Sequence, residues 1–247
     1  MIKDVAFFSE RGIREKNQDA IYVSSEKKCG VFVLADGMGG HAEGEVASSA
    51  IVTGIKKWWE SNDFLSENVG IEYITDQCNR LLLNINHEVY QYYNSQGLVG
   101  GSTVVLLIIC NDRYSILSAG DSRIYHANNM GLQQLTVDDV WENLPEVAQT
   151  MNTEQIAADP RQGKLTEVLG SDKNLRVRRQ DGSLIGKENF LLCSDGLYRY
   201  CMGTFLEEVL CKGYRFKSAK KMSEMIRENA LMAGTDDNYS AIVCKIG

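Results

Sequence analysis

The chain has 247 residues, the size of one large domain or, less commonly, of two small ones. Hydrophobic residues at 44% and charged residues at 24% are ordinary for a globular protein and exclude a disordered, collagen-like or coiled-coil chain. A net charge of −7 and a pI near 5.1 argue against a broad basic face for nucleic acid or anionic lipid. We therefore expect a single domain over residues 1–247 that binds neither nucleic acid nor membrane.

The cysteines and the first residues indicate the compartment. The seven cysteines include no CxxC pair, and several lie in apolar runs, where free cysteine behaves as a small hydrophobic residue. Residues 1–12 lack a basic stretch followed by a long apolar one, and the longest apolar run, 104–110, is too short to span a bilayer. These features predict a cytoplasmic protein with reduced cysteines.

Apolar runs with period two or rich in β-branched residues predict strands. In chain order they cover 5–8, 31–35, 103–110, 114–119, 122–126, 190–193 and 239–246. The links 111–113 and 120–121 are too short for a helical crossover, so the pattern favours antiparallel pairing over a doubly wound sheet.

Apolar residues spaced by three and four predict helices over 43–59, 71–92, 204–210 and 217–232. The stretch 137–163 is polar, weakly periodic and holds both prolines, so we expect a mobile flap that is partly helical near 144–151. The whole pattern predicts an α+β fold in which helices cover sheets.

Aspartates recur at the ends of the apolar strands. Asp36 follows the strand at 31–35 and opens Asp36-Gly-Met-Gly-Gly-His41, whereas Asp121 and Asp195 follow the strands at 114–119 and 190–193. Asp237 precedes the last strand. One Asp-Gly alone is most simply a turn, but several carboxylates at converging strand ends would need cations. Because the donors are all oxygen, the pattern favours Mg²⁺ or Mn²⁺ over Zn²⁺.

Ordered segments along the chain carry a family resemblance. They are Gly12-Ile-Arg14-Glu-Lys-Asn17-Gln-Asp19-Ala, Ala35-Asp36-Gly-Met-Gly-Gly-His41-Ala-Glu-Gly44-Glu-Val-Ala, Gly100-Gly-Ser-Thr103, Ala119-Gly-Asp121-Ser-Arg123-Ile-Tyr125, Leu165-Thr-Glu-Val-Leu-Gly170, Cys193-Ser-Asp195-Gly196-Leu and Asp237-Asn238-Tyr-Ser. Each is weak alone, but the ordered set resembles the metal-dependent serine/threonine protein phosphatases of type 2C in their bacterial single-domain form. The resemblance implies a β-sandwich of two antiparallel sheets flanked by helix pairs, with metals at one end.

The same resemblance implies a set of metal ligands. Asp36 would bridge two Mn²⁺ or Mg²⁺ ions, and Asp195 and Asp237 would complete the first. The carbonyl of Gly37 and Asp19, the latter through water, would hold the second. Two such ions lower the pKa of a shared water, so a metal-bridging hydroxide would attack phosphorus in line.

Two further residues receive roles from the resemblance. Asp121 matches the position associated with a third, weaker metal, and Arg14 matches the arginine that grips the substrate phosphate. A guanidinium fork suits phosphate oxygens because it binds them bidentately. The alternative for Arg14 is a surface salt bridge to Glu10 or Glu15.

The chain departs from the family pattern at three places. Gln18 precedes Asp19 where many relatives have a glutamate, which removes one acidic group. Met38 stands where animal relatives have a histidine, so His41 is a candidate general acid or, equally, a histidine hydrogen-bonded near the start of the first helix. Residues 136–140 replace a common histidine-serine ending with Asp139-Val140, and we expect this change to alter recognition of protein substrates.

The leading hypothesis is an enzyme that hydrolyses phosphoserine and phosphothreonine on proteins. Its substrates would be proteins phosphorylated by a cognate serine/threonine kinase, and the chain would act as a monomer. Two alternatives remain: a noncatalytic pseudophosphatase that binds partners, and a metal-dependent hydrolase of small phosphate esters. The intact Asp36, Asp195 and Asp237 favour an enzyme. No P-loop or GxGxxG motif supports nucleotide binding.

Overall fold

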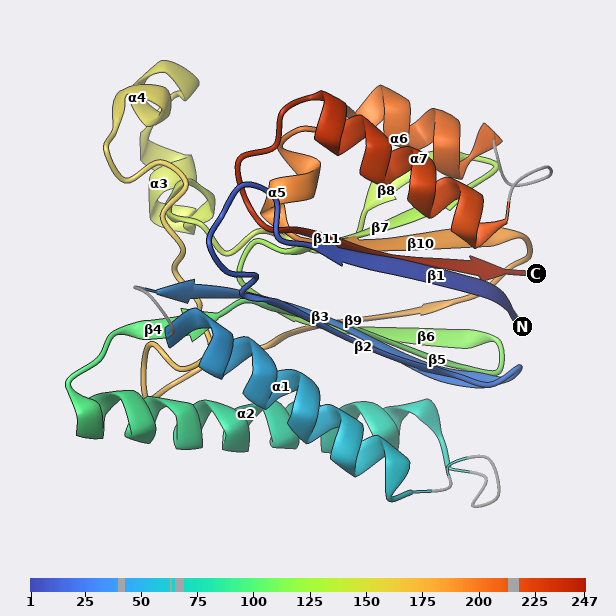
Figure 1. Ribbon diagram of the computed structural model, residues 1–247, viewed down its shortest axis with the longest axis horizontal. Coiled ribbons are helices and arrows are strands. Elements are labelled where there is room, and N and C mark those ends of the chain that lie inside the picture. Colours follow the sequence, from blue (N-terminus) through green and yellow to red (C-terminus); the bar gives the residue numbers. More distant parts are fainter. Residues whose placement is uncertain (40–42, 63, 65–68, 213–217) are drawn as a thin grey trace.

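Two antiparallel sheets lie face to face, and helices cover the outer face of each (Figure 1). The structure is a computed structural model that describes residues 1–39, 43–62, 64, 69–212 and 218–247. This arrangement confirms the predicted α+β sandwich.

The strands form two sheets, sheet A and sheet B. Sheet A has the order β1 (Ile2–Glu10), β11 (Tyr239–Ile246), β10 (Glu188–Cys193), β7 (Arg123–Asn128) and β8 (Gly131–Gln134). Sheet B has the order β2 (Asp19–Ser25), β3 (Cys29–Gly39), β5 (Val104–Cys110), β6 (Arg113–Ala119) and β9 (Arg178–Ser183), with β4 (Gly100–Ser102) paired to the end of β3. The first and last strands of the chain are therefore neighbours in sheet A.

The helices are divided between the two sheets. Helices α1 (Glu43–Glu60) and α2 (Ile71–Gln96) cover sheet B, whereas α6 (Gly203–Leu210) and α7 (Ala219–Met232) cover sheet A (Figure 1). A short helix, α5 (Asp195–Tyr198), follows β10 directly. No helix in the described ranges is both long and apolar enough to cross a membrane.

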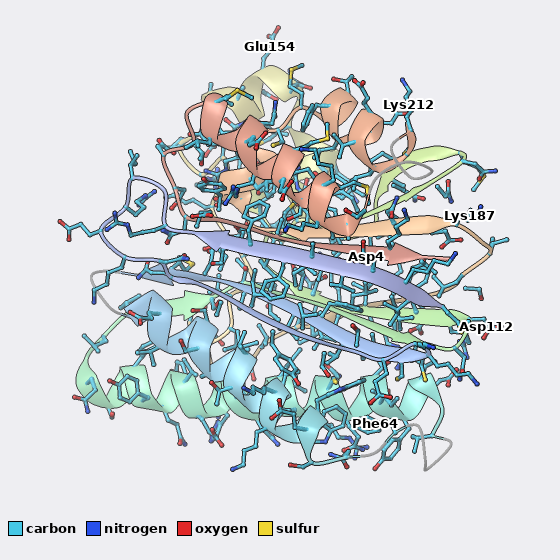
Figure 2. All side chains as sticks on the ribbon, turned by 45° about the vertical axis from the view of Figure 1, so that its right-hand side comes forward. Asp4, Phe64, Asp112, Glu154, Lys187 and Lys212 are labelled. Atoms are coloured by element: carbon cyan, nitrogen blue, oxygen red, sulfur yellow. The ribbon has the colours of Figure 1, made fainter. Side chains whose placement is uncertain are left out.

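Strand β5 shows why the interior has three apolar layers. All seven of its residues are buried, because one face meets helices and the other meets sheet A. Val104, Leu106 and Ile108 pack with the core under α1 and α2. Val105 and Leu107 pack with the core between the sheets, and side chains fill these spaces throughout (Figure 2). A strand covered on both faces reads as a continuous apolar run, which is how the sequence revealed it.

The strands that the sequence did not reveal are β2, β4, β8 and β9. Strands β2, β8 and β9 lie at sheet edges, and β4 is a short strand beside the end of β3. Strand β9 has the sequence RRQDGS and is mostly exposed. Strand β9 gains its pairing from backbone hydrogen bonds and keeps polar side chains in water, so it has no apolar pattern to detect.

All seven cysteines are free thiols, as predicted. Cys29 and Cys110 lie opposite each other on β3 and β5, and both are buried. Hydrogen bonding to the neighbouring Cys29 thiol lowers the pKa of Cys110 to about 7.

The segment 137–163 is more helical than expected. It holds a 3₁₀ turn at Trp141–Asn143, α3 (Pro145–Thr150) and α4 (Thr153–Ala158). At its base, Asp139 is only 2% exposed and accepts hydrogen bonds from Arg178 Nε at 2.7 Å and from the Gly120 N–H at 3.3 Å. The Asp139 carboxylate is therefore an internal anchor that fastens the segment to β9 and to the turn after β6, whereas an effect of Asp139-Val140 on recognition of protein substrates stays a prediction.

Replacing Asp139 by alanine should destabilise the fold. The variant leaves Arg178 and the Gly120 N–H without their carboxylate partner, which should lower the free energy of unfolding by about 2 kcal/mol. Urea denaturation of D139A and the parent measures the difference. Asp159→Ala is the control, since Asp159 pairs only with Arg161, two residues away, and should change the melting temperature little. Equal stability of D139A and the parent would contradict the anchoring role.

Candidate metal centre

Strand register brings Asp19 and Asp36 together. In the β2–β3 pair Asp19 lies opposite Asp36. Strand β3 does not end before Asp36, as the sequence suggested, because β4 pairs with residues 37–39 and extends it to Gly39. The Asp36 backbone is fixed on its other side, where the Thr103 N–H donates to the Asp36 carbonyl at 2.9 Å.

Asp195 and Asp237 reach the same place from sheet A. Cys193 ends β10 opposite Ala241 of β11, so the chain leaves β10 toward Asp195 at the edge where Asp237 leads into β11. A hydrogen bond ties the two sheets together here, since Ser194 Oγ donates to Asp19 Oδ2 at 2.8 Å. The Asp36 carboxylate is within hydrogen-bonding reach of the Asp19 carboxylate and of the Asp195 carboxylate.

Asn238 fixes the loop that carries Arg14. Its Nδ2 donates to the carbonyls of Arg11 and Lys16, each at 2.8 Å, and its Oδ1 accepts from the Gln18 N–H at 2.9 Å. Gly12 has φ +60°, and a Cβ there would lie 2.2 Å from the Asp237 carbonyl oxygen. The loop can therefore pass this close to Asp237 only with glycine at this position.

Arg14 lies on the rim of the site. Its Nη2 is 2.8 Å from Asp237 Oδ2, and its Nε donates to the Asp236 carbonyl at 3.0 Å, so its partners are these residues rather than Glu10 or Glu15. The side chain is 54% exposed and faces a hollow of about 310 Å³. The hollow is lined by Arg14, Glu15, Lys16, Gln18, Gly39 and Asn238.

Asp121 lies at the other side of the cluster and is 5% exposed. Tyr198 Oη donates to its Oδ2 at 3.0 Å. Arg199 Nη2 lies 3.8 Å from the same oxygen and 2.9 Å from Asp195 Oδ2. We call Asp19, Asp36, Asp121, Asp195 and Asp237 the acidic cluster.

In the described part of the chain, no ion pair joins a cationic side chain to Asp36 or Asp19. Burial, and then the nearby Asp19 and Asp195, raise the pKa of Asp36 well above its usual range. Burial also raises the pKa of Asp19 to about 6 and, together with Asp195, that of Asp121 to about 6. In the described part of the chain no donor reaches the buried Oδ1 of Asp19. A buried carboxylate oxygen without a partner is costly, and a cation would satisfy it.

The cluster suits a hard divalent cation in its chemistry. All its donors are oxygens, which such cations prefer. Gly37, the other predicted donor, follows Asp36 and lies against the first turn of α1. A Cβ at Gly37 would be 2.3 Å from the Gly44 carbonyl oxygen. Within the described residues no three acidic, histidine or cysteine side chains already stand close enough to enclose an ion. Asp237 is held by Arg14, whose side chain is exposed enough to turn away, and Asp195 Oδ2 is held by Arg199. His41 lies outside the described residues.

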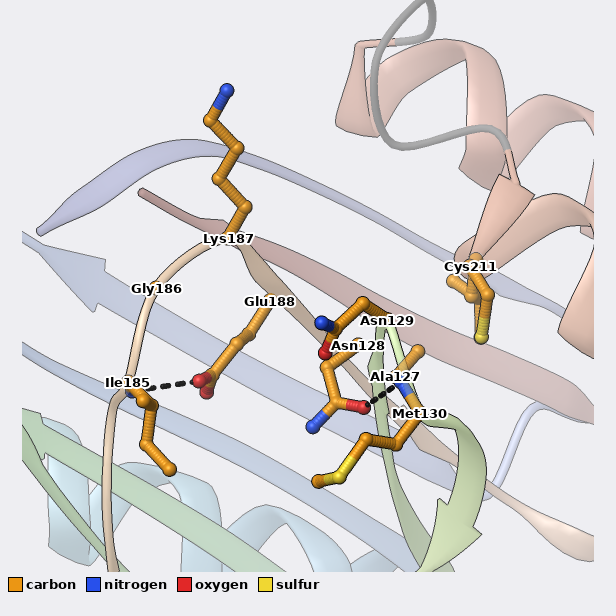
Figure 3. Close-up of a pocket in the computed structure, with 10 residues that line it drawn as sticks. Ala127, Asn128, Asn129, Met130, Ile185, Gly186, Lys187, Glu188 and Cys211 are labelled. Carbon is orange, nitrogen blue, oxygen red and sulfur yellow. Dashed lines mark hydrogen bonds between the residues drawn. The ribbon is translucent and has the colours of Figure 1, made fainter.

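A larger hollow, of about 530 Å³, lies between the β7–β8 turn and the start of β10 (Figure 3). Its acidic residue, Glu188, is already engaged, since its carboxylate contacts His126 Nε2 at 2.9 Å and accepts from the Ile185 N–H at 2.7 Å. The larger volume of this hollow therefore does not make it the candidate active site.

The sequence reasoning assigned no role to several residues that shape the site. Ser194 and Asn238 were inside the matched segments, next to Asp195 and Asp237, and their position beside a ligand was a signal. Arg199 follows Asp195 by four residues, the spacing of an ion pair on one helix face, and this signal could have revealed it.

Known proteins resemble this chain along its whole length. Residues 11–237 match the family pattern of protein phosphatase 2C. The chain is 30% identical over 244 residues to the serine/threonine phosphatase Stp of Listeria monocytogenes, which covers 96% of this chain and 93% of that protein. It is 24% identical to the serine/threonine protein phosphatase PstP of Mycobacterium tuberculosis, over 96% of this chain and 44% of that protein. A solved serine/threonine phosphatase from S. agalactiae shares the fold, with a TM-score of 0.88 over 99% of both chains at 24% identity.

Asp36→Asn should have opposite effects with and without metal. In chelator, raised carboxyl pKa values mean that stability is full below about pH 4 and falls as pH rises through about 6, so the parent should melt at lower temperature at pH 7 than at pH 5. Removing one charge should leave the melting temperature at pH 7 unchanged or higher. In millimolar Mn²⁺, D36N should lose most of the metal-induced stabilisation, which is about 2.7 kcal/mol at a hundredfold excess over Kd.

Thermal melts in both buffers test this. Asp112→Asn, in the β5–β6 turn at the opposite end of sheet B, is the control because it removes the same charge away from the cluster. Equal destabilisation of D36N with and without Mn²⁺ would show that the Asp36 carboxylate has a structural role and does not bind metal.

Proposed function

Since this chain belongs to the protein phosphatase 2C family and is a metal-dependent serine/threonine protein phosphatase, we propose that its acidic cluster holds two Mn²⁺ or Mg²⁺ ions and that Arg14 binds the phosphate to be hydrolysed. One observation carries the proposal. Carboxylates from both sheets converge on Asp36 at one end of the sandwich, and the exposed Arg14 lies beside them on an open hollow.

In this proposal Asp36 would help to hold both ions. Asp195 and Asp237 would complete the donors for one ion, and the Gly37 carbonyl with Asp19 would complete those for the other. When bound, the two ions neutralise the carboxylates and activate a water for in-line attack on phosphorus. The unpartnered Oδ1 of Asp19 supports this assignment, since it lies buried beside Asp36.

Arg14 has two successive roles in this proposal. Without metal it is the counter-ion of Asp237, at 2.8 Å. Once Asp237 binds a cation, the guanidinium is free to turn its fork to a phosphate, where two parallel N–H donors match two oxygens. Phosphate binding and metal binding should therefore support each other.

The surroundings of the hollow suit a phosphorylated side chain on a protein. The hollow opens at the surface, and Ile13 and Met38, which precede the lining residues Arg14 and Gly39 in the chain, are 78% and 42% exposed. Apolar side chains at a rim can contact the residues that flank a phosphorylation site. We propose substrates of an opposing serine/threonine kinase, acted on by a cytoplasmic monomer, with all of residues 1–247 forming one catalytic domain.

Activity should depend completely on divalent metal. Protein treated with chelator and then freed of it should not hydrolyse a phosphothreonine peptide, and added Mn²⁺ or Mg²⁺ should restore turnover. A free nucleotide assayed in parallel distinguishes a protein phosphatase from a hydrolase of small phosphate esters. Full activity of metal-stripped protein would overturn the proposal, and metal binding without any turnover would favour the noncatalytic alternative.

Arg14→Ala should weaken phosphate binding and leave the metals in place. Losing a bidentate, charge-assisted contact should lower kcat/KM by about tenfold to a hundredfold, or about 1.5 to 3 kcal/mol. Steady-state kinetics with the phosphopeptide, together with calorimetric Mn²⁺ titration, measures both properties. Arg11→Ala is the matched control, because Arg11 is exposed in the same loop and its guanidinium donates to the Glu15 carbonyl rather than to an acidic side chain. Unchanged kinetics of R14A would assign Arg14 to the surface.

A further inference from the structure

The Arg199 guanidinium lies between two carboxylates of the acidic cluster. Its Nη2 lies 2.9 Å from Asp195 Oδ2 and 3.8 Å from Asp121 Oδ2. Asp195 follows β10 and Asp121 follows β6, so one guanidinium links residues that come from different sheets. A positive charge is thus already present where two acidic side chains meet.

Asp121 is held in this arrangement by a chain of contacts. Tyr198 Oη donates to Asp121 Oδ2 at 3.0 Å, and the Arg123 guanidinium stacks 3.6 Å from the centre of the Tyr198 ring. Arg123 in turn binds Asp138 with Nε at 3.1 Å and Nη2 at 2.7 Å. The Arg123 guanidinium thus binds Asp138 with its N–H groups and stacks on Tyr198 with its face. This stacking holds the Tyr198 ring in the position from which its hydroxyl binds Asp121.

The two sides of the acidic cluster differ in their need for a cation. On the Asp121 side, the Oδ2 atoms of Asp121 and Asp195 both have positively charged or hydroxyl partners. On the Asp19 side, the buried Oδ1 of Asp19 has no donor in the described part of the chain. Divalent ions should therefore gain most beside Asp19 and Asp36, where negative charge is uncompensated.

From this asymmetry we infer that Arg199 is a built-in counter-ion that takes the place of a third divalent ion at Asp121 and limits the cluster to two ions. The inference rests on the proposed function, because it assumes that the cluster binds metal. It gives Arg199 a positioning role: the guanidinium holds Asp195 and Asp121 together without touching the substrate.

Counting bound ions tests the inference without any activity assay. Metal-free protein is titrated with Mn²⁺ by calorimetry, and the ions bound per chain are confirmed by equilibrium dialysis. The parent should bind two ions, and Arg199→Gln should bind three. A guanidinium about 4 Å from a bound cation repels it strongly, although the exposure of Arg199 to water weakens this repulsion. The third ion should therefore bind to R199Q at least roughly tenfold more tightly than any further ion binds to the parent.

Three variants separate charge from structure. Arg199→Lys keeps the charge and should stay at two ions. Asp121→Asn added to R199Q should return the count to two, because the extra ion needs the Asp121 carboxylate. Arg179→Gln is the matched control: Arg179 also bridges two carboxylates, Asp76 at 2.7 Å and Asp181 at 3.0 Å, and it should bind two ions like the parent.

The outcomes distinguish this inference from the proposed function. A parent that binds three ions, or an R199Q variant that still binds two with unchanged affinity, would overturn the role of Arg199 and leave the two-ion centre standing. If R199Q melts too low to titrate, Asp121→Asn alone decides: unchanged affinity for two ions supports the inference, and loss of an ion overturns it. A parent that binds no Mn²⁺ would overturn the metal centre itself, and the inference with it.

Discussion

Repulsion among like charges governs the organisation of this protein. Asp36 lies within reach of carboxylates from both sheets, and burial together with that neighbourhood raises its pKa far above the usual range. Such a cluster is unfavourable by itself and persists only because the surrounding fold stabilises it. The three apolar layers supply that stability, and the arginines at the two rims, Arg14 and Arg199, offset part of the charge.

The two sheets share an apolar core along most of their length. At the end where this charge is concentrated, Ser194 of one sheet donates to Asp19 of the other. Asn238 then binds three backbone groups of the loop before β2, which carries the rim arginine. A residue at the start of β11 thus positions a loop more than two hundred residues earlier in the chain, because β1 and β11 are paired.

Much of the acidic cluster could be predicted from the sequence because its aspartates lie at or near the ends of strands, several of which have clear apolar patterns. The short links between strands predicted antiparallel pairing, and the family resemblance implied the sandwich. The partners of the arginines could not be predicted, since Arg14 and Asp237 are far apart in sequence and meet only through tertiary structure. The same is true of Asp139, which reads as a flap residue but is buried against Arg178 by the pairing of β6 with β9.

The pairing of β1 with β11 also decides where attachments to this protein would emerge. Ile2 lies opposite Ile246, and the Gly247 N–H donates to the Met1 carbonyl at 3.0 Å, so both termini lie together at one end of sheet A (Figure 1). Glu10 and Tyr239 form the other end of the same pair, next to the acidic cluster. Eight strand residues separate the two ends, roughly 25 Å. A tag, tether or solid support joined at either terminus would therefore lie at the end of the sandwich opposite the acidic cluster, and a fused segment would reach the cluster only by folding back along the length of the sandwich.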